Sequence, residues 1–223
     1  MAVVTRKRKP GRPVDLEARA RRRAEILDVA IRVFAKVGFP NADLQVVADE
    51  LGVGKGTIYR HFETKEKLFL AAADAGMQQL VEHIFGRLEG VEDPVDYIRT
   101  AGLAYVEFFQ KRPELVEILI QERAEFRDSI PSTHLVYRDR NRKVFEDVLR
   151  VGVRDGLLRD VNIAEATTAF ANLLYGTVVC GCLEGSSRRL NRMGQSAVDL
   201  FLHSILQESP GRDTDSKAGR PRS

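Results

Sequence analysis

A short stretch from Lys55 to His61 contains the residue types that contact DNA. The candidates on its outer face are Lys55, Gly56, Thr57, Tyr59, Arg60 and His61. Basic and hydroxyl side chains can hydrogen-bond base edges and phosphate oxygens, and a glycine lets the backbone come close. We therefore expect Lys55, Gly56 and Thr57 to approach base edges in a major groove, and Tyr59 to bind a phosphate.

Two short predicted helices position these side chains. The first has apolar residues at helical spacing, namely Leu44, Val47, Ala48 and Leu51. Gly52 then ends that helix, because glycine adopts a left-handed conformation at little cost. In the second helix, Ile58 and Phe62 stand four residues apart and face inward together. The pattern, at about residues 44–63, predicts a helix-turn-helix.

The same stretch resembles the TetR-type transcriptional regulators, whose pattern at this turn is Gly-Val-Ser-Lys-Gly-Thr-Leu/Ile-Tyr-x-His-Phe. From Gly52 to Phe62 this chain reads Gly-Val-Gly-Lys-Gly-Thr-Ile-Tyr-Arg-His-Phe. The departure is Gly54, where serine is common as the helix cap; glycine there costs only a few tenths of a kcal/mol. The match continues into Thr64-Lys65-Glu66-Lys67-Leu68, so the resemblance covers roughly residues 20–75.

Two further DNA contacts are predicted outside the motif. Lys65 stands at the start of a helix, where free backbone N–H groups favour a phosphate oxygen. Arg12 belongs to the basic, proline-containing segment 1–17, which we expect to be a flexible arm. Arg12 could enter an A·T-rich minor groove, and the alternative is a solvated tail that attracts phosphates without specificity.

Charge is distributed unevenly along the 223 residues. The net charge is +3, yet residues 1–67 carry 15 Lys and Arg against 9 Asp and Glu, whereas residues 68–206 carry 16 against 20. The basic N-terminal end would be drawn to nucleic acid. With no apolar leader, and with only two cysteines, the sequence predicts a cytoplasmic protein.

The remaining chain is predicted to be all-α, with about nine helices in total. After a helix at 18–37 and the motif, we expect helices at about 65–88, 94–111, 113–127, 132–155, 163–183 and 193–207. This gives a DNA-binding domain at 18–67, a helical ligand-binding and dimerisation domain at 68–207, and a disordered tail at 208–223.

Residues 166–183 form an uncharged run of the length that could span a membrane. Polar residues Thr167, Thr168, Asn172 and Thr177 are spread through it, and we expect a helix buried on several sides instead. The resemblance implies that the last two helices pair with their copies in a second subunit as a four-helix bundle. Small residues such as Gly176 and Gly181 would allow that approach.

The resemblance also implies a small-molecule pocket in the C-terminal helices. Aromatic candidates for its lining are Tyr105, Phe108, Phe109, Phe126, Phe145, Phe170 and Tyr175. Candidate polar groups in the same region are Glu107, Gln121, Glu122, Arg123, Glu125 and Asn172. For each aromatic residue, ordinary core packing is the competing interpretation.

Enzyme chemistry has little support in the sequence. The four histidines are scattered without metal-ligand spacing, and Cys180 and Cys182 would point to different faces of one helix. No phosphate-cradling glycine loop or nucleophile elbow is present. We expect a non-enzyme without a metal or cofactor.

Two functions therefore compete. One is a homodimeric repressor that a small-molecule effector releases from a palindromic operator. The other is a DNA-tethered helical module that regulates through a protein partner, or an activator. A closed apolar cavity would favour the first, whereas an exposed apolar patch away from the dimer face would favour the second.

Overall fold

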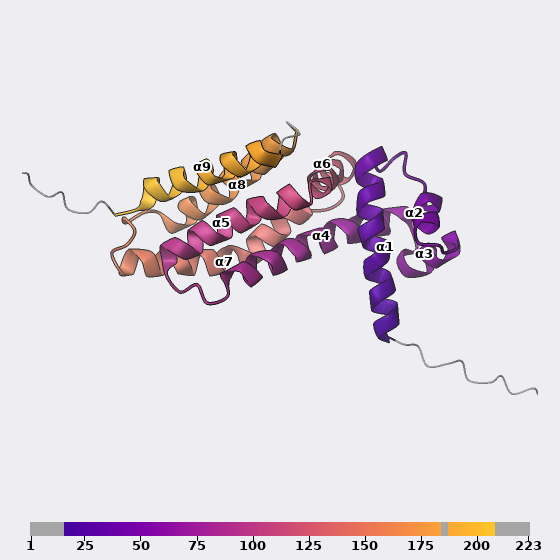
Figure 1. The fold of residues 1–223 in the computed structure, drawn as a ribbon, viewed down its shortest axis with the longest axis horizontal. Coiled ribbons are helices and arrows are strands. Elements are labelled where there is room, and N and C mark those ends of the chain that lie inside the picture. Colours follow the sequence, from indigo (N-terminus) through magenta and orange to yellow (C-terminus); the bar gives the residue numbers. More distant parts are fainter. Residues whose placement is uncertain (1–15, 184–186, 208–223) are drawn as a thin grey trace, which may run out of the picture. The chain divides into compact units, whose positions relative to one another are not determined.

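The computed structural model describes residues 16–183 and 187–207, which are almost entirely helical (Figure 1). The described helices are α1 (Leu16–Val37), α2 (Leu44–Glu50), α3 (Lys55–Phe62), α4 (Lys65–Leu88), α5 (Pro94–Lys111), α6 (Glu114–Phe126), α7 (Thr133–Arg154), α8 (Ile163–Leu183) and α9 (Ser187–Ile205). The only β pairing within these ranges is an isolated bridge between Leu158 and Leu206. The all-α expectation is confirmed. Most of the expected arm, including Arg12, and the tail at 208–223 lie outside the described residues.

The last helix differs most from its expected bounds, since α9 begins at Ser187 and not at Met193. Its early turns are held by Leu190, which is buried and packs against Gly181 of α8. A Cβ at Gly181 would lie 2.6 Å from a methyl group of Leu190, so only glycine permits this approach. Gly181 therefore serves packing within the chain.

The described chain divides into two compact units. One contains the residues up to Gly76 together with 117–130, and the other contains Met77–Val116 and the residues from Pro131 onward. The sequence placed the boundary at residue 67 and assigned 117–130 to the C-terminal domain. The contacts of Phe126 and Gln121 explain why this segment belongs with the N-terminal unit.

A cluster of four phenylalanine rings forms part of the core of the first unit. Phe39 follows α1 and lies 5.1 Å from Phe69 of α4 and 5.0 Å from Phe126 of α6, measured between ring centroids. Phe34 of α1 completes the cluster at 5.1 Å from Phe69. Gln121 of α6 accepts a hydrogen bond from the Phe39 N–H and donates one to the Phe34 carbonyl. The second half of α6 thus fastens the end of α1.

The helix-turn-helix has the predicted geometry. Gly52 ends α2 with φ +63°, and the N–H of Val53 donates to the carbonyl of Ala48. Ile58 and Phe62 are both buried, as their spacing indicated. The opposite side of α3 is consequently free to face a ligand.

In the second unit, α5 packs against α7, α8 and α9. Figure 1 shows α9 running alongside α5 and α8. Two glycines allow the close approach of α5 and α9: a Cβ at Gly102 would lie 2.7 Å from Val198, and one at Gly194 would lie 2.6 Å from Val106. Of these helices, α5, α7 and α8 contribute to the lining of the cavity described below.

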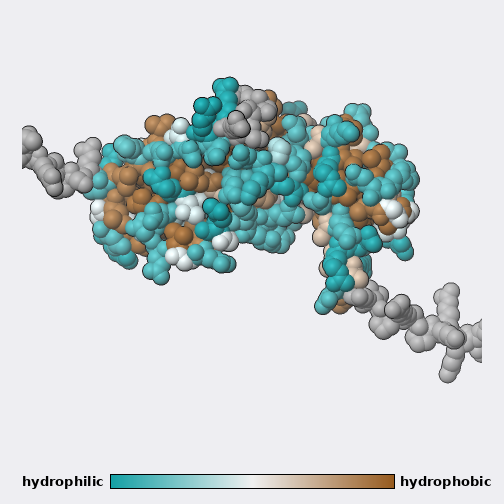
Figure 2. All heavy atoms as spheres, in the orientation of Figure 1, coloured by the Kyte–Doolittle hydropathy of each residue, from teal (hydrophilic) through white to brown (hydrophobic). Residues whose placement is uncertain are grey.

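One face of α8 and α9 is unusually apolar for a surface. By length and composition α8 could cross a membrane, yet only 28% of its apolar window is buried within the chain. Leu173 of α8 and Leu200 of α9 are both exposed. Figure 2 shows brown, hydrophobic patches among teal side chains over these helices. Gly176 is also exposed, and a Cβ added there would meet no atom within 4 Å.

Candidate nucleic-acid interface and ligand cavity

The outer face of α3 presents the predicted DNA-contacting side chains to solvent. Tyr59 is 42% exposed, and Gly56 has open space where a Cβ would stand. The guanidinium of Arg60 donates to the hydroxyl of Thr57 at 3.0 Å. The structure therefore brings these residues together on one accessible helix face, suited to hydrogen bonding with a nucleic acid.

Lys55 has a partner within the protein. Its ammonium lies 2.6 Å from Oδ1 of Asp43, and the same oxygen caps α2 by accepting a hydrogen bond from the N–H of Gln45. These interactions lower the pKa of Asp43, with the Gln45 hydrogen bond the largest cause and the Lys55 hydrogen bond the next. Lys55 is thus oriented at the start of α3 before any DNA is bound.

Lys65 also has partners within its own unit. Its ammonium donates to the carbonyls of Pro40 and Ala42 at 3.0 and 3.2 Å, and it lies 4.8 Å from the ring centroid of Phe39. The side chain holds the connection between α1 and α2. Sequence reasoning gave Lys65 only a phosphate contact, because its carbonyl partners lie more than twenty residues away in the chain.

His61 lies in a strongly positive environment. Partial burial lowers its pKa, and the charges of Arg19, Arg23, Arg60 and Arg22 lower it further, in that order. Arg23 of α1 covers the ring of Phe62 at 4.4 Å. Several arginines near the end of α3 therefore create a field that would attract phosphate groups.

The second unit contains a cavity of about 180 Å³. Its lining comes from α4, α5, α7 and α8, namely Met77, Leu80, Val81, Ile84, Phe85, Leu88, Tyr97, Ala101, Tyr105, His134, Tyr137, Arg138, Asn141, Arg142, Val144, Phe145, Thr167, Phe170, Ala171 and Leu174. Most of these side chains are aliphatic or aromatic, which is typical of a site for a small organic molecule.

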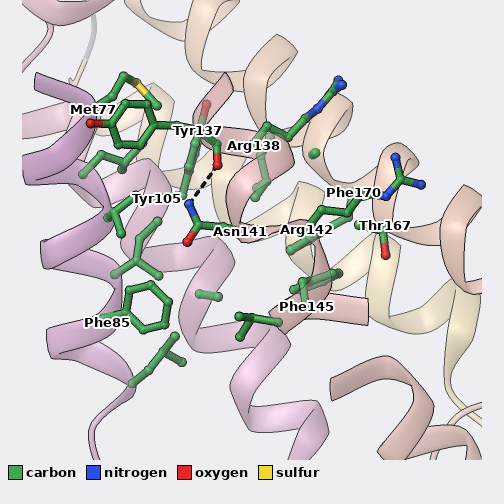
Figure 3. A pocket seen from close by; sticks show the side chains of 18 of the residues that line it. Met77, Phe85, Tyr105, Tyr137, Arg138, Asn141, Arg142, Phe145, Thr167 and Phe170 are labelled. Carbon is green, nitrogen blue, oxygen red and sulfur yellow. Dashed lines mark hydrogen bonds between the residues drawn. The ribbon is translucent and has the colours of Figure 1, made fainter. Parts of the chain in front are cut away.

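Three of the seven aromatic candidates line this cavity: Tyr105, Phe145 and Phe170 (Figure 3). The rings of Phe145 and Phe170 are stacked, with centroids 5.1 Å apart and planes at 9°. They offer a flat apolar wall.

The other four aromatic candidates lie elsewhere. Phe126 belongs to the phenylalanine cluster of the first unit. Phe108 and Phe109 pack edge to face against each other within α5, and the ring of Tyr175 packs on the ring of His134, with centroids 4.3 Å apart. Helical spacing alone did not separate these core residues from those at the cavity.

None of the expected polar groups is among the lining residues of this cavity. Gln121 hydrogen-bonds α1 in the first unit, and Asn172 lines an outer groove that it shares with Arg142 and Thr168. Glu107 is held by Lys111 of its own helix at 2.6 Å. That hydrogen bond is the largest cause of the lowered pKa of Glu107.

The polar lining residues that sequence reasoning missed stand mainly on α7. His134, Arg138, Asn141 and Arg142 follow one another at helical spacing and share a face with the predicted Phe145, and this shared face was the signal that could have found them. The signal was hidden because arginine and asparagine are normally read as a solvated face.

Tyr105 and His134 form a buried polar pair at one side of the cavity. The tyrosine hydroxyl lies 3.2 Å from Nε2 of His134. Burial, assisted by the charge of Arg138, lowers the pKa of His134 to about 4. His134 is therefore neutral at physiological pH and adds no positive charge to the cavity.

The two arginines of the lining are already paired. Nε of Arg142 donates to Glu146 at 2.7 Å, and Nε of Arg138 donates to Asp139 at 3.0 Å. The hydrogen bond from Arg142 is the largest cause that lowers the pKa of Glu146. Both guanidinium charges are thus compensated by carboxylates of α7.

Thr167 of α8 differs from the other threonines of its helix. Thr168 and Thr177 donate to the carbonyls of Ala164 and Leu173 at 2.8 and 2.7 Å. The Thr167 hydroxyl is buried and has no hydrogen-bond partner among the described residues. In Figure 3, Thr167 and Tyr105 lie on different sides of the pocket.

Within residues 16–183 and 187–207, no group of three or more His, Cys, Asp or Glu side chains could hold a metal ion. Neither Cys180 nor Cys182 forms a disulfide bond.

Comparison with known proteins shows which proteins this chain is similar to. The sequence profile described as "Bacterial regulatory proteins, tetR family" matches residues 26–72. The HTH-type transcriptional repressor KstR2 of Mycolicibacterium smegmatis is 29% identical over 195 residues, covering 84% of this chain and 92% of that protein.

Two solved structures share the fold. A putative transcriptional regulator from Saccharomonospora viridis in complex with choline has a TM-score of 0.70 at 23% identity, covering 85% of this chain and 100% of that one. The ketosteroid transcriptional regulator KstR2 of Mycobacterium tuberculosis has a TM-score of 0.63 at 21% identity, covering 84% and 97%. The profile, the relative and the common fold together support a TetR-type helix-turn-helix transcriptional regulator.

Proposed function

We propose that the protein is a homodimeric, cytoplasmic and non-enzymatic repressor that a small molecule releases from a palindromic operator. The observation that carries this proposal is the largely apolar cavity in the second unit of a chain whose first unit contains a helix-turn-helix. A regulator that acted only through a protein partner would have no use for such a cavity.

DNA is bound by two copies of the motif in successive major grooves. Half-sites lie about 34 Å apart per helical turn, so a conformation that misplaces either α3 loses contacts on one side. We propose Lys55, Gly56 and Thr57 for base edges. Tyr59, Arg60 and His61 stand beside them for phosphates.

Helix α4 is the proposed route of coupling. It contributes the buried Phe69 to the first unit and the cavity residues Met77 and Phe85 to the second. A ligand that prefers one position of this helix shifts the equilibrium between DNA-binding and released forms. A coupling of about 1–3 kcal/mol gives roughly a 5- to 150-fold change in operator affinity, and the coupling is reciprocal.

The proposal is tested in two steps. Selecting bound fragments from genomic DNA first identifies the operator. Candidate ligands are then titrated into the protein with and without operator DNA, by calorimetry. Weaker ligand binding in the presence of operator supports release. Equal affinity in both titrations would eliminate induction by that ligand.

The exposed apolar face of α8 and α9 supports the first of the two competing functions. A regulator acting through a protein partner needs an apolar patch distinct from the dimer face. The exposed Leu173 and Leu200 stand on the two helices proposed for dimerisation, so a second copy of the chain accounts for them.

A further inference from the structure

Arginine side chains of α1 lie close to the last turn of α3, within the first unit. Arg19 and Arg23 stand four residues apart, so they are neighbours on one face of α1. The guanidinium of Arg23 lies 4.4 Å from the ring centroid of Phe62, and its Nη1 donates to the carbonyl of His61 at 3.5 Å. This face of α1 therefore adjoins the helix proposed to bind DNA.

The arginines at the start of α1 differ in how their charge is compensated. Arg21 lies 3.5 Å from the carboxylate of Glu17 on its own helix. Within the described part of the chain, Arg19 and Arg23 have no such carboxylate partner. The positive charges of Arg19 and Arg23 are therefore available to an anionic ligand.

The charges that act on His61 are all positive. Partial burial is the largest cause that lowers the pKa of His61, and four guanidinium groups lower it further. In order of effect, these are Arg19, Arg23, Arg60 and Arg22. The last of them is paired with Glu25 at 2.8 Å, and Arg60 donates to the neutral hydroxyl of Thr57. His61 is therefore neutral at physiological pH in the free protein.

A phosphate of the DNA backbone would reverse this electrostatic situation. Guanidinium groups bind phosphate oxygens strongly, often with two parallel hydrogen bonds. The phosphate would offset the charges of Arg19 and Arg23, and it could accept a hydrogen bond from a protonated imidazole. A nearby negative charge favours the protonated form of a histidine. The pKa of His61 should therefore rise when a phosphate is bound beside it.

From this arrangement we propose that Arg19, Arg23 and His61 form a site for one backbone phosphate of the bound DNA, and that His61 takes up a proton when that phosphate enters. The inference rests on the proposed function, and it adds α1 to the DNA-binding surface. Because the DNA-bound form holds one proton more than the free form, DNA affinity rises as the pH falls through the pKa of His61 in the complex.

Variants of the arginines test the phosphate contact. Arg19→Ala and Arg23→Ala should each weaken binding equally to operator and scrambled duplexes, and should reduce the slope of log affinity against log salt concentration by about one. Arg21→Ala is the matched control and should keep the wild-type slope, since Glu17 already compensates that charge. Arg23→Lys keeps the positive charge and should keep the slope, which separates the phosphate contact from the packing of Arg23 on Phe62.

The pH dependence of binding tests the proton uptake. Wild-type DNA affinity should rise as the pH falls from 8 to 6, by no more than about tenfold per pH unit, because one proton is taken up. His61→Gln does not titrate and should flatten this profile, whereas His203→Gln, at an exposed position of α9, should keep it. His134 stays neutral over this range, because burial lowers its pKa to about 4. Calorimetry in two buffers of different ionisation enthalpy counts the protons taken up.

Two results would each overturn the inference. One is a wild-type salt slope in either Arg19→Ala or Arg23→Ala, and the other is a pH profile that His61→Gln leaves unchanged. Both effects should also appear with the scrambled duplex, because a phosphate carries no sequence information. Equal binding of operator and scrambled duplexes, with both effects intact, would contradict operator recognition and leave the phosphate site standing. The two proposals can therefore fail separately.

Discussion

The ammonium of Lys55 lies 2.6 Å from Oδ1 of Asp43, the oxygen that also caps α2. One carboxylate thus caps the start of one helix of the motif and orients the first side chain of the next. The contact places a negative charge beside a face proposed to bind phosphates, which gives Asp43 and Lys55 opposite expected effects on DNA affinity.

Replacing Lys55 by Ala should lower operator affinity and relax the preference at one base pair, by roughly 1–3 kcal/mol. Asp43→Asn should keep the cap, because asparagine caps helices as well as aspartate does, and should tighten binding to any DNA by removing a negative charge. Fluorescence anisotropy with operator and scrambled duplexes at several salt concentrations measures both effects.

Tyr59→Phe serves as the comparison for Lys55→Ala. It removes only a hydroxyl, so affinity should fall about equally for all operator variants. If Lys55→Ala lowered the affinity equally for all operator variants and Tyr59→Phe lowered it for one base pair only, Lys55 would be the phosphate contact and Tyr59 the base contact.

Lys65→Ala should lower the free energy of unfolding by about 1–2 kcal/mol, because two hydrogen bonds from a charged group to the carbonyls of Pro40 and Ala42 are lost. Urea denaturation measures this change. Lys67→Ala is the control, since Lys67 makes an exposed pair with Glu63 only one helical turn away and should change stability little. Unchanged stability of Lys65→Ala, with weaker DNA binding, would assign Lys65 to phosphate contact alone.

Gly176→Arg should yield monomers that bind operator poorly, because a single motif loses the second half-site and its high effective concentration. The folded monomer should tolerate the change, since Gly176 is exposed with open space around it. Gly86→Arg is a matched control on α4, where the glycine is equally exposed and open. Sedimentation velocity decides the question, and an intact dimer of Gly176→Arg would place the interface elsewhere.

Acid should destabilise the protein through His134. The pKa of His134 is about 4 in the folded chain and about 6.5 when unfolded. Between these values the unfolded chain binds a proton that the folded chain does not, so stability is full above pH 6.5 and falls as the pH drops. The expected loss from pH 7.5 to pH 5 is about 2 kcal/mol.

Urea titrations at the two pH values test this expectation. His134→Phe should be less stable than the wild type at pH 7.5, because the hydrogen bond with Tyr105 is lost, but should lose less on acidification. His203→Gln, at an exposed position of α9, should keep the wild-type pH dependence. Identical pH dependence in the wild type and His134→Phe would contradict the assignment.

The sequence predicted where the helices begin and end better than it predicted which residues contact one another in the folded chain. Asp93 and Pro94 give α5 its start, and the side chain of Asp93 does cap Val95 and Asp96. Gly52 likewise ends α2 as its conformational freedom indicated. Such signals are local, because a cap or a stop acts within one helical turn. This is why most helix bounds could be read directly from the chain.

The cavity and the partners of the basic side chains depend on distant residues, and periodicity does not encode them. Phe126 and Phe145 look alike in sequence, yet one belongs to the first unit and the other lines the cavity. Leu190 begins the packing of α9 only because Gly181 lies opposite. The carbonyl partners of Lys65 likewise become visible only in the folded chain.

Gln121 and Phe126 complete the N-terminal unit from a segment synthesised some forty residues after Gly76. On the ribosome, Phe34, Phe39 and Phe69 therefore emerge well before the ring and the amide that finish their packing. A nascent chain that pauses before residue 117 exposes an incomplete aromatic cluster, a state prone to capture by chaperones. Grafting this DNA-binding head onto another protein requires two splice points, one on either side of 117–130, since a single cut within α4 would leave the Phe39 N–H without the Gln121 side chain.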